Sequence, residues 1–335
     1  MKLRRHGGLV AATVRPLVRR LLQAIPTLFG IVLICFVLMS LAPGDMVDIL
    51  SAEGQISDPE VLARMRALYG LDVPVPQQFL NYVAGVLTLD FGYSYRHARP
   101  VLDIILDRLP ATILLMTTGL VAAVLLGMLA GAVAALRVNT VTDAILSILA
   151  VVFFAMPSFW FSLMLVVLFS VKLGWLPVAG MQTIGASHAG ILAQLLDISR
   201  HLVLPALSLA LFYAAIYARV MRSSMLQVYN LDFVRTARAK GLGERRILLR
   251  HVLRNALLPV VTLIGIQFGT MLAGSVVIES VFSWPGLGTL LLESVTSRNF
   301  PLMMGIMIFS SVLVILANLV VDIVYRLLDP RISTR

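Results

Sequence analysis

Side chains that could do covalent or redox chemistry are scarce in this chain, and their spacing excludes several familiar sites. The five histidines include no pair four residues apart, so an HExxH zinc site is absent. The lysines are Lys2, Lys172 and Lys240, and none belongs to a GxxxxGKS/T phosphate loop. Cys35 is the single cysteine, which rules out a disulfide or a thiolate metal site within the chain. We therefore predict no catalytic residue, metal site or cofactor in this chain.

The densest run of basic side chains, segment 219–257, contains an ordered pattern. Asp232 is a favourable N-cap residue, and Gly241 is typical of the position just after a helix. Arg238 and Lys240 fall in the last turn, where cations favour the helix dipole. These features predict a separate helix of about eight residues, roughly 12 Å long.

One face of this predicted helix should present a small apolar knob. Phe233 and Ala237 lie four residues apart and share a face, with Arg235 and Arg238 around them. A short helix with such a knob has the shape needed to plug a groove on a cytoplasmic protein. The alternative, a basic loop that only sets topology, leaves the knob unexplained. The residues of this candidate docking helix are Asp232, Phe233, Arg235, Thr236, Ala237, Arg238, Ala239, Lys240 and Gly241.

A second helix is predicted over 244–257. Arg246, Arg250 and Arg254 recur every four residues along one stripe. The apolar side chains of another stripe are Leu249, Val252, Leu253 and Ala256. This pattern is typical of an interfacial helix that lies under the bilayer.

The composition indicates which elements must carry these segments. Of the 335 residues 59% are hydrophobic and 13% charged, whereas a soluble domain has roughly 45–50% apolar and about 25% charged residues. Six charge-free stretches are each about long enough to cross roughly 30 Å of hydrocarbon as a helix. We therefore predict an all-α, polytopic membrane protein with six transmembrane helices. The stretches are 21–44, 109–136, 144–171, 201–218, 255–278 and 299–321.

Two segments allow a different interpretation. The uncharged stretch 173–196 contains Gly, Pro and polar residues that would leave backbone groups unsatisfied in lipid, so we expect an extramembrane loop. The first span could be a signal peptide, because Arg19 and Arg20 precede it and Ser40-Leu41-Ala42 is a small-x-small triplet. Its apolar run exceeds the about 7–15 residues of a signal sequence, and Pro43 occupies the cleavage position. We therefore expect a retained helix.

Lys and Arg are divided unevenly between the two sides that six spans would define. The side with both termini holds 19 of the 27 Lys and Arg residues. Because basic segments stay in the cytoplasm, both termini are predicted to be cytoplasmic. The net charge of +10 therefore reflects topology and contact with anionic headgroups. Nucleic acid is not an expected partner, because no basic patch interleaved with aromatic residues stands outside the membrane.

The first outer segment, 43–110, is predicted to form a small folded cap. Pro59 begins and Gly70 ends an amphipathic pattern, and 77–89 should form a second short helix. The segment is either a solvated loop or a landing surface for an external partner.

Asp, Glu, Lys and Arg side chains are absent from the six uncharged stretches. A proton or sodium relay would need such groups deep in the membrane. If the protein moves a solute uphill, the energy must therefore come from another subunit.

Segment 235–259 resembles the cytoplasmic EAA loop of permease subunits of binding-protein-dependent ABC importers, in the form found in dipeptide, oligopeptide and nickel permeases. Arg235 replaces the glutamate of the generic motif, and Pro259 lies farther from Gly241 than in the generic spacing. Both departures are usual in the peptide branch. The matching residues are Arg235-Thr-Ala-Arg-Ala-Lys-Gly241-Leu and Arg254-Asn-Ala-Leu-Leu-Pro259.

The resemblance extends over nearly the whole chain and is to the first, B-type permease of that branch. A small departure is Asn299, where the family more often has an acid. The further matching motifs are Pro43-Gly44-Asp45, Tyr69-Gly-Leu-Asp72, Asp90-Phe-Gly-Tyr-Ser94, Met156-Pro-Ser-Phe-Trp160, Arg222-Ser-Ser-Met-Leu226, Glu279-Ser-Val-Phe-Ser-Trp-Pro-Gly-Leu-Gly288 and Asp322-Ile-Val-Tyr-Arg-Leu-Leu-Asp-Pro-Arg331.

The resemblance implies a type I ABC importer transmembrane domain in the bacterial inner membrane. It implies a homologous second permease, an external solute-binding protein and two ATPase subunits that bind ATP and Mg²⁺ and contact the loop 232–259. The solute stays open among peptides, nickel chelates, glutathione and opines. The implied segments are a cytoplasmic N-terminus 1–20, a first transmembrane helix 21–42, an external cap 43–107, a five-helix core 108–326 with the coupling loop 219–257, and a cytoplasmic tail 327–335.

A peptide-like solute needs a wet route, and irregular backbone at membrane depth is tolerated where it lines a cavity or lies at the surface. Pro157 should kink the third span. Glu279 would be costly facing lipid, so we expect it to face the partner permease or the outer vestibule. Gln267 either lines the route or forms a helix–helix hydrogen bond. The candidate pathway residues are Met156, Pro157, Ser158, Trp160, Gln267, Glu279, Ser283, Trp284, Pro285 and Gly286.

Two other classes of protein are alternatives to an importer subunit: a self-contained channel and a membrane-embedded enzyme. A self-contained channel or facilitator would also need no buried charge, and gene neighbourhood separates it from an importer subunit. A membrane-embedded enzyme would need a paired acid, base or nucleophile within a span, and the sequence contains none.

Overall fold

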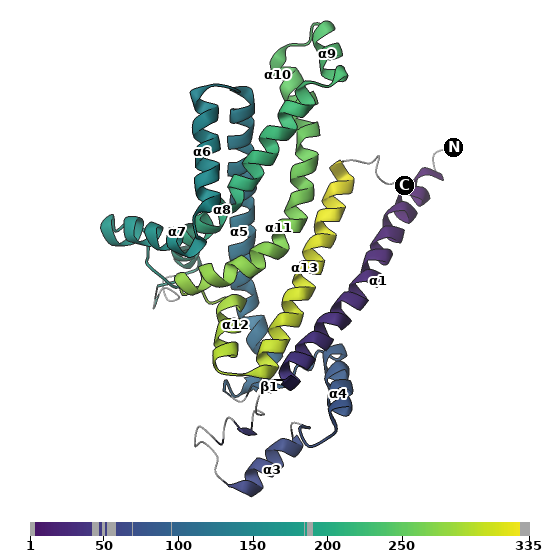
Figure 1. Ribbon diagram of the computed structural model, residues 1–335, viewed down its shortest axis with the longest axis vertical. Helices are drawn as coiled ribbons and strands as arrows, with labels where there is room; N and C mark the ends of the chain where they lie inside the picture. The colour runs from purple at the N-terminus through teal and green to yellow at the C-terminus, as the bar shows by residue number, and fades with distance from the viewer. Residues whose placement is uncertain are drawn as a thin grey trace. The chain divides into compact units, whose positions relative to one another are not determined.

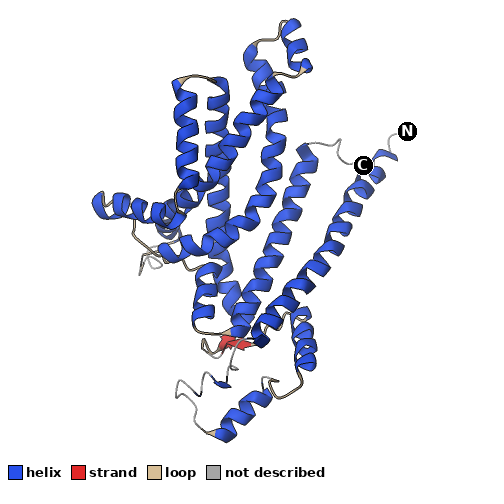
Figure 2. Cartoon of the chain, in the orientation of Figure 1, coloured by secondary structure: helices blue, strands red, loops and turns tan. Residues whose placement is uncertain are grey.

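Helices make up almost all of the structure, which confirms the predicted all-α class (Figures 1 and 2). The protein is described by a computed structural model. The residues that the structure describes are 4–41, 47–48, 51, 58–68, 70–94, 96–183, 185 and 190–328.

The chain divides into two compact units, and each is described by itself. Unit 1 combines Met1–Pro110 with Leu290–Ile315. Unit 2 combines Ala111–Thr289 with Leu316–Arg335. The candidate docking helix and the candidate pathway residues all belong to unit 2.

Among the described residues, four helices are long and apolar enough to cross a membrane, and a bent pair of helices is a fifth candidate. The apolar helix Leu22–Leu38, within the first predicted span, is shorter than these. The count of six transmembrane helices therefore stays a prediction. The long helices are α5 (Val101–Leu136), α8 (Ile191–Tyr229), the continuous helix Glu244–Val281, and α13 (Phe300–Leu328).

In unit 1, α1 (Arg4–Leu41) extends well before residue 21, where the predicted span begins. The two short helices predicted in the outer segment are confirmed as α3 (Pro59–Leu68) and α4 (Val75–Leu87). Aromatic rings join α1 to α4, because the ring centroids of Phe36 and Phe79 lie 5.2 Å apart in an edge-on contact.

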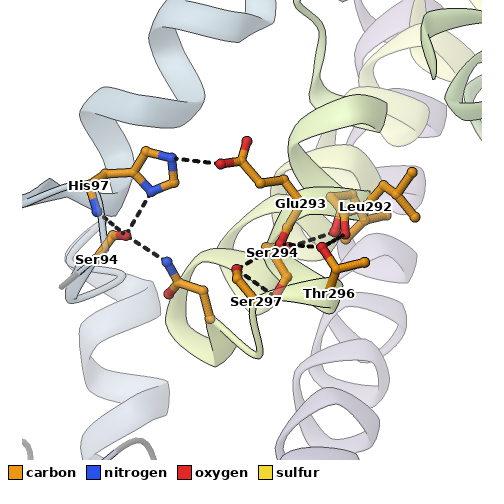
Figure 3. Close-up of polar contacts among 9 residues, drawn as sticks. Ser94, His97, Leu292, Glu293, Ser294, Thr296 and Ser297 are labelled. Atoms are coloured by element: carbon orange, nitrogen blue, oxygen red, sulfur yellow. Dashed lines mark hydrogen bonds and ion pairs between the residues drawn. The ribbon is translucent and has the colours of Figure 1, made fainter. Parts of the chain in front are cut away.

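Unit 1 also contains a two-stranded antiparallel hairpin, formed by β1 (Tyr93–Ser94) and β2 (Arg99–Pro100). A polar network connects this hairpin to the chain between α12 (Leu287–Thr296) and α13 (Figure 3). Asn299 donates a hydrogen bond from Nδ2 to Ser94 Oγ at 2.6 Å. The same oxygen lies 3.1 Å from His97 Nδ1, and His97 Nε2 lies 3.5 Å from Glu293 Oε1.

Ser94, His97 and Glu293 contact one another in the same order as the serine, histidine and acid of a catalytic triad. Ser94 is fully buried, however, and its hydroxyl oxygen already accepts the Asn299 N–H. A substrate therefore has no route to the oxygen, and the network serves as a structural connection within unit 1.

In unit 2, α5, α8 and α11 (Leu253–Val281) supply most of the hydrophobic core, and α6 (Val141–Ala155) packs against α8. Glycines allow α5 and α8 to approach closely. A Cβ atom on Gly127 would lie 2.6 Å from the Ala214 carbonyl oxygen, and one on Gly131 would lie 2.4 Å from that of Ala218. The Gly127-x-x-x-Gly131 spacing is therefore a packing surface.

The third predicted span is broken. α6 ends at Ala155, and α7 (Ser158–Leu165) leaves at 107° and continues as the π-helix η1 (Val166–Lys172). Pro157 has no backbone N–H to donate and precedes α7, so the predicted kink at this residue is confirmed.

The predicted loop 173–196 is partly wrong. Regular structure is absent from the described residues between Leu173 and Thr183, as predicted. α8, however, begins at Ile191, ten residues before the uncharged stretch that starts at 201. Asp197 and Arg200 are therefore helical, and the Asp197 carboxylate accepts the Thr183 N–H at 2.6 Å.

Candidate functional site

The separate short helix predicted in segment 219–257 is confirmed as α9 (Asp232–Ala239), and its docking role stays a prediction. Its end is a Schellman motif, because the Gly241 N–H donates to Arg238 O at 2.9 Å and the Leu242 N–H to Ala237 O at 3.2 Å. Gly241 has a φ of +77°, the left-handed conformation that glycine adopts without strain. The prediction for Gly241 is therefore confirmed, with Lys240 as the C-cap.

The start of α9 differs from the prediction. Leu231 occupies the N-cap position and Asp232 lies in the first turn, without a side-chain capping bond. The first backbone N–H groups still benefit, because a carboxylate in the first turn is favourable to the helix dipole. Asp232 is thus a first-turn acid and not the N-cap.

The knob predicted on α9 is also composed differently. Ala237 is buried, together with Val234, and both anchor the helix in the hydrophobic core of unit 2. Phe233 is 41% exposed on another side, and the Arg235 side chain is 70% exposed. The sequence could not separate these faces, because in eight residues Phe233 and Ala237 fit one stripe as well as Val234 and Ala237 do. The face that α9 presents is Phe233, Arg235, Thr236 and Ala239.

A side-chain pair fixes the angle of α9. Arg238 donates to both Glu244 oxygens, at 2.6 Å from Nε and 3.2 Å from Nη2. Its guanidinium also lies 5.8 Å from the centre of the Tyr229 ring. The Glu244 carboxylate raises the pKa of Arg238 further, so the pair stays charged at physiological pH. The last turn of α9 is thus connected to the end of α8 and to the start of the next helix.

The second predicted helix, 244–257, does not end at 257. α10 (Glu244–Ile247), the π-helix η3 (Leu248–Val252) and α11 form one continuous helix, so this segment is the beginning of a span. Leu249 is 55% exposed, and the predicted apolar stripe is therefore interrupted. The wide turn of η3 explains the change, because a π-turn adds one residue and rotates the side chains before it.

At the other end of α11, Glu279 is fully buried within the chain. Its carboxylate accepts a hydrogen bond from Thr112 Oγ1 at 3.0 Å, from the Gly288 N–H at 2.7 Å and from the Thr289 N–H at 3.0 Å. The prediction that Glu279 faces the partner permease or the vestibule is therefore wrong. The cost of burying this side chain is offset internally, because the carboxylate caps the N-terminus of α12.

The turn beside Glu279 is packed around this carboxylate. A Cβ atom on Gly286 would lie 2.4 Å from the Glu279 carboxyl group, so only glycine fits there. Trp284 is fully buried, and its indole Nε1–H donates to Ala111 O at 2.9 Å. Trp284 and Gly286 therefore support the turn from within and do not line a surface. Ser283 is the exposed residue of the turn, with a φ of +49°.

The remaining predicted pathway residues lie elsewhere in unit 2. Gln267 accepts a hydrogen bond from Thr270 Oγ1 at 2.7 Å within the same helix, and its side chain makes no helix–helix hydrogen bond to the described residues. That Gln267 lines the solute route stays a prediction. Trp160 is 44% exposed on α7. Of the other candidate pathway residues, Pro157 is exposed. Met156, Ser158 and Pro285 are half-buried.

The structure thus brings Glu279, Trp284 and Gly286 together and leaves Gln267 and the residues of α7 outside this cluster. Sequence reasoning missed Thr112, whose hydroxyl also accepts the Leu287 N–H at 2.7 Å. Nothing near Thr112 in the sequence signals this contact, since its partner lies 167 residues away. Pro285 and Gly286, which favour an irregular backbone, are the signal in the sequence that indicated the turn.

Two family descriptions match the chain. "Binding-protein-dependent transport system inner membrane component" matches residues 123–334, and the corresponding N-terminal description matches residues 13–116. The likeness to solved structures concerns the fold. An amino acid ABC transporter has a TM-score of 0.51 at 18% identity, over 67% of this chain and 94% of that chain. The MetNI methionine ABC transporter has a TM-score of 0.54 at 16% identity, over 67% and 96%.

Curated relatives match almost end to end. The di/tripeptide transport system permease protein DppB of Pseudomonas aeruginosa is 40% identical, over 94% of this chain and 97% of its own. The oligopeptide transport system permease protein AppB of Bacillus subtilis is 39% identical, over 95% and 98%. The glutathione transport system permease protein GsiC of Escherichia coli K12 is 41% identical, over 94% and 97%. This chain therefore belongs to the family of inner-membrane permease components of binding-protein-dependent transport systems.

Proposed function

We propose that this permease subunit passes peptides or peptide-like solutes across the inner membrane in an ATP-driven import complex. Three similar permeases are named for di/tripeptides, oligopeptides and glutathione, all of which contain peptide bonds. The complex would contain a homologous second permease, two ATPase subunits that bind ATP and Mg²⁺, and an external solute-binding protein. The chain itself would be non-catalytic, and its segments 43–107 and 327–335 would lie outside and inside the cell.

The element that couples this chain to the ATPase is α9. One observation carries this assignment: α9 is anchored by buried Val234 and Ala237 and by the Arg238–Glu244 pair, while Phe233 and Arg235 stand exposed. A helix fixed on its inner side and presenting an aromatic side chain is suited to fill a groove and to follow the movement of its partner. Because the ATPase subunits are cytoplasmic, α9 would also lie on the cytoplasmic side, together with both termini.

The solute route is proposed to pass the exposed members of the candidate pathway residues and not the buried members. Ser283 and Trp160 are exposed in the described structure, whereas Glu279, Trp284 and Gly286 are buried. The buried group would hold the turn in shape while Ser283 meets the solute, the binding protein or the second permease. A cysteine at Ser283 should therefore be protected from thiol reagents in the assembled, substrate-loaded complex and labelled in the isolated subunit.

Two glycines of the coupling loop offer a matched test. A Cβ atom on Gly241 or on Gly243 would meet nothing within 4 Å, so neither position is crowded. Gly241 has a φ of +77°, whereas Gly243 has an extended backbone (φ −65°, ψ 145°) that suits a β-branched residue. Val at position 241 should cost about 1–2 kcal/mol, equivalent to about a five- to thirtyfold shift in a conformational equilibrium.

The experiment compares Gly241→Val with Gly243→Val in the complex reconstituted with its ATPase subunits. We expect Gly241→Val to insert normally but to lower solute uptake and solute-stimulated ATP hydrolysis, and Gly243→Val to retain both. Equal uptake and hydrolysis by the two variants would show that the end of α9 has no part in coupling.

A further inference from the structure

An ion pair connects the first turn of α6 with α8, close to the end of α8 that leads to α9. Asp143 is 5% exposed, and its carboxylate accepts two parallel hydrogen bonds from Arg222, each 2.7 Å long, from Nε and from Nη2. This two-pronged geometry fixes direction as well as distance between the two helices. The Arg222 side chain is 32% exposed.

The Asp143 carboxylate also binds the turn between α5 and α6. The Asn139 N–H donates to Asp143 Oδ2 at 3.1 Å, and Asn139 has a φ of +62°. Ser147 Oγ lies 3.5 Å from Oδ1. One carboxylate therefore joins three parts of unit 2: the 137–140 turn, α6 and α8.

Two further contacts hold α8 against α5 and α6 within a turn or two of Arg222. Gly131 leaves no room for a side chain against Ala218 and Met221. On α6, the Phe154 ring lies 5.7 Å from the Arg219 guanidinium. The C-terminal half of α8 is thus bound to the α5–α6 pair by close packing and by charge.

From Arg222 the chain reaches α9 through the last part of α8 and a two-residue turn, Asn230 and Leu231. α8 continues as a helix from Arg222 to Tyr229, two further turns. Tyr229 contacts Arg238 of α9, and Arg238 is bound to Glu244. A force applied to α9 is therefore delivered to α8 at a point about 10 Å from the Asp143–Arg222 pair, given 1.5 Å of rise per residue.

We propose that Asp143 and Arg222 are positioning residues for coupling, which make the ends of α5, α6 and α8 a single lever that carries α9. The proposal rests on the coupling role of α9 given above. Without the pair, α9 would still bind its ATPase. The movement of α9 would then shift α8 relative to α5 and α6 and would not move these two helices with it. The variant complexes should then hydrolyse ATP without the matching transport.

A merely structural ion pair makes a different prediction. Breaking it would lower the amount of inserted permease but leave the number of solute molecules carried per ATP unchanged. One unpaired charge left in the buried site costs more folding free energy than the removal of both partners. The double variant therefore separates the effect of losing the ion pair from the effect of leaving one charge unpaired.

The experiment measures solute transported per ATP hydrolysed in proteoliposomes for Asp143→Asn, Arg222→Gln and the double variant. The matched control is Asp197→Asn, the same change at an acid of α8 that accepts the Thr183 N–H and hydroxyl and lies 3.6 Å from His201 Nδ1. We expect each single variant to lower the ratio about five- to tenfold, the double variant to be no worse than either, and the control to match the parent chain. If Asp143→Asn does not insert, Arg222→Lys, which keeps the charge without the fork, takes its place with the same expectation.

A second readout reports the lever itself. Spin labels at Val138 and Thr236, both exposed, should give one narrow distance distribution in the parent complex and a broad one in Asp143→Asn. A ratio within twofold of the parent value, or an unchanged distance distribution, would overturn the proposal. Failure of the coupling role of α9 is recognised separately, because α9 would then make no crosslink to an ATPase even in the parent complex.

Discussion

The carboxylate of Glu279, near the end of α11, accepts the backbone N–H of Gly288 at 2.7 Å and thereby caps the beginning of α12. The bond folds the chain back on itself within nine residues. An acid at a helix N-terminus is favourable because it satisfies free N–H groups and complements the helix dipole. A charged residue near a membrane span is thus retained as part of the fold, and it needs no contact with solute.

Replacing Glu279 with alanine tests this role. Alanine removes the carboxylate oxygen Oε2 that accepts the N–H groups of Gly288 and Thr289. Each buried donor left unsatisfied costs about 1–3 kcal/mol, so Glu279→Ala should lower the thermal unfolding midpoint of the purified permease. Glu60→Ala is the control, because the Glu60 side chain is 76% exposed. Equal midpoints for the two variants would contradict the capping role.

The hairpin network of unit 1 gives a second stability prediction. Ser94→Ala removes the oxygen that accepts the Asn299 Nδ2–H, and Asn299 Oδ1 is already buried without a hydrogen-bond partner. We expect a loss of about 1–3 kcal/mol and earlier proteolysis of the outer segment. In the control, Ser297→Ala, the lost hydroxyl donates only to backbone carbonyls one turn earlier, Glu293 O at 2.6 Å and Ser294 O at 3.5 Å. If both variants resist protease equally, the network does not hold the hairpin.

Much of this architecture could be predicted from the sequence because it depends on local patterns. The helices Pro59–Leu68 and Asp232–Ala239 follow from Pro and Gly at their boundaries, and Pro157 breaks its span as expected. These signals act within a few residues of the structure they determine.

The errors concern contacts between distant residues. The sequence predicts that Glu279 faces the partner permease or the outer vestibule, because a charge facing lipid is costly, but it does not show that Thr112 lies beside this residue. Asp143 lies between two predicted spans, and the sequence does not show that Arg222, 79 residues later, binds it at a buried position. Pairings of this kind depend on how helices pack, which the local pattern of charges does not specify.

Sidedness can be tested with thiol labelling. The native Cys35 is 1% exposed and gives little background. We expect a cysteine at Leu87, which is 80% exposed in α4, to react with an impermeant reagent added to intact cells. A cysteine at Gly243, in the coupling loop, should react only after the membrane is opened. The reverse pattern would invert the proposed topology.

A crosslink from α9 to the ATPase tests the coupling role of α9 most directly. A photo-crosslinking residue at Phe233, the exposed aromatic side chain of α9, is compared with one at Tyr93, which is 42% exposed on the hairpin. The assembled complex is irradiated with and without ATP, and the products are identified by mass spectrometry. We expect an ATPase adduct from position 233 and none from position 93. An assembled, active complex in which position 233 yields no ATPase adduct under either condition would contradict the coupling role.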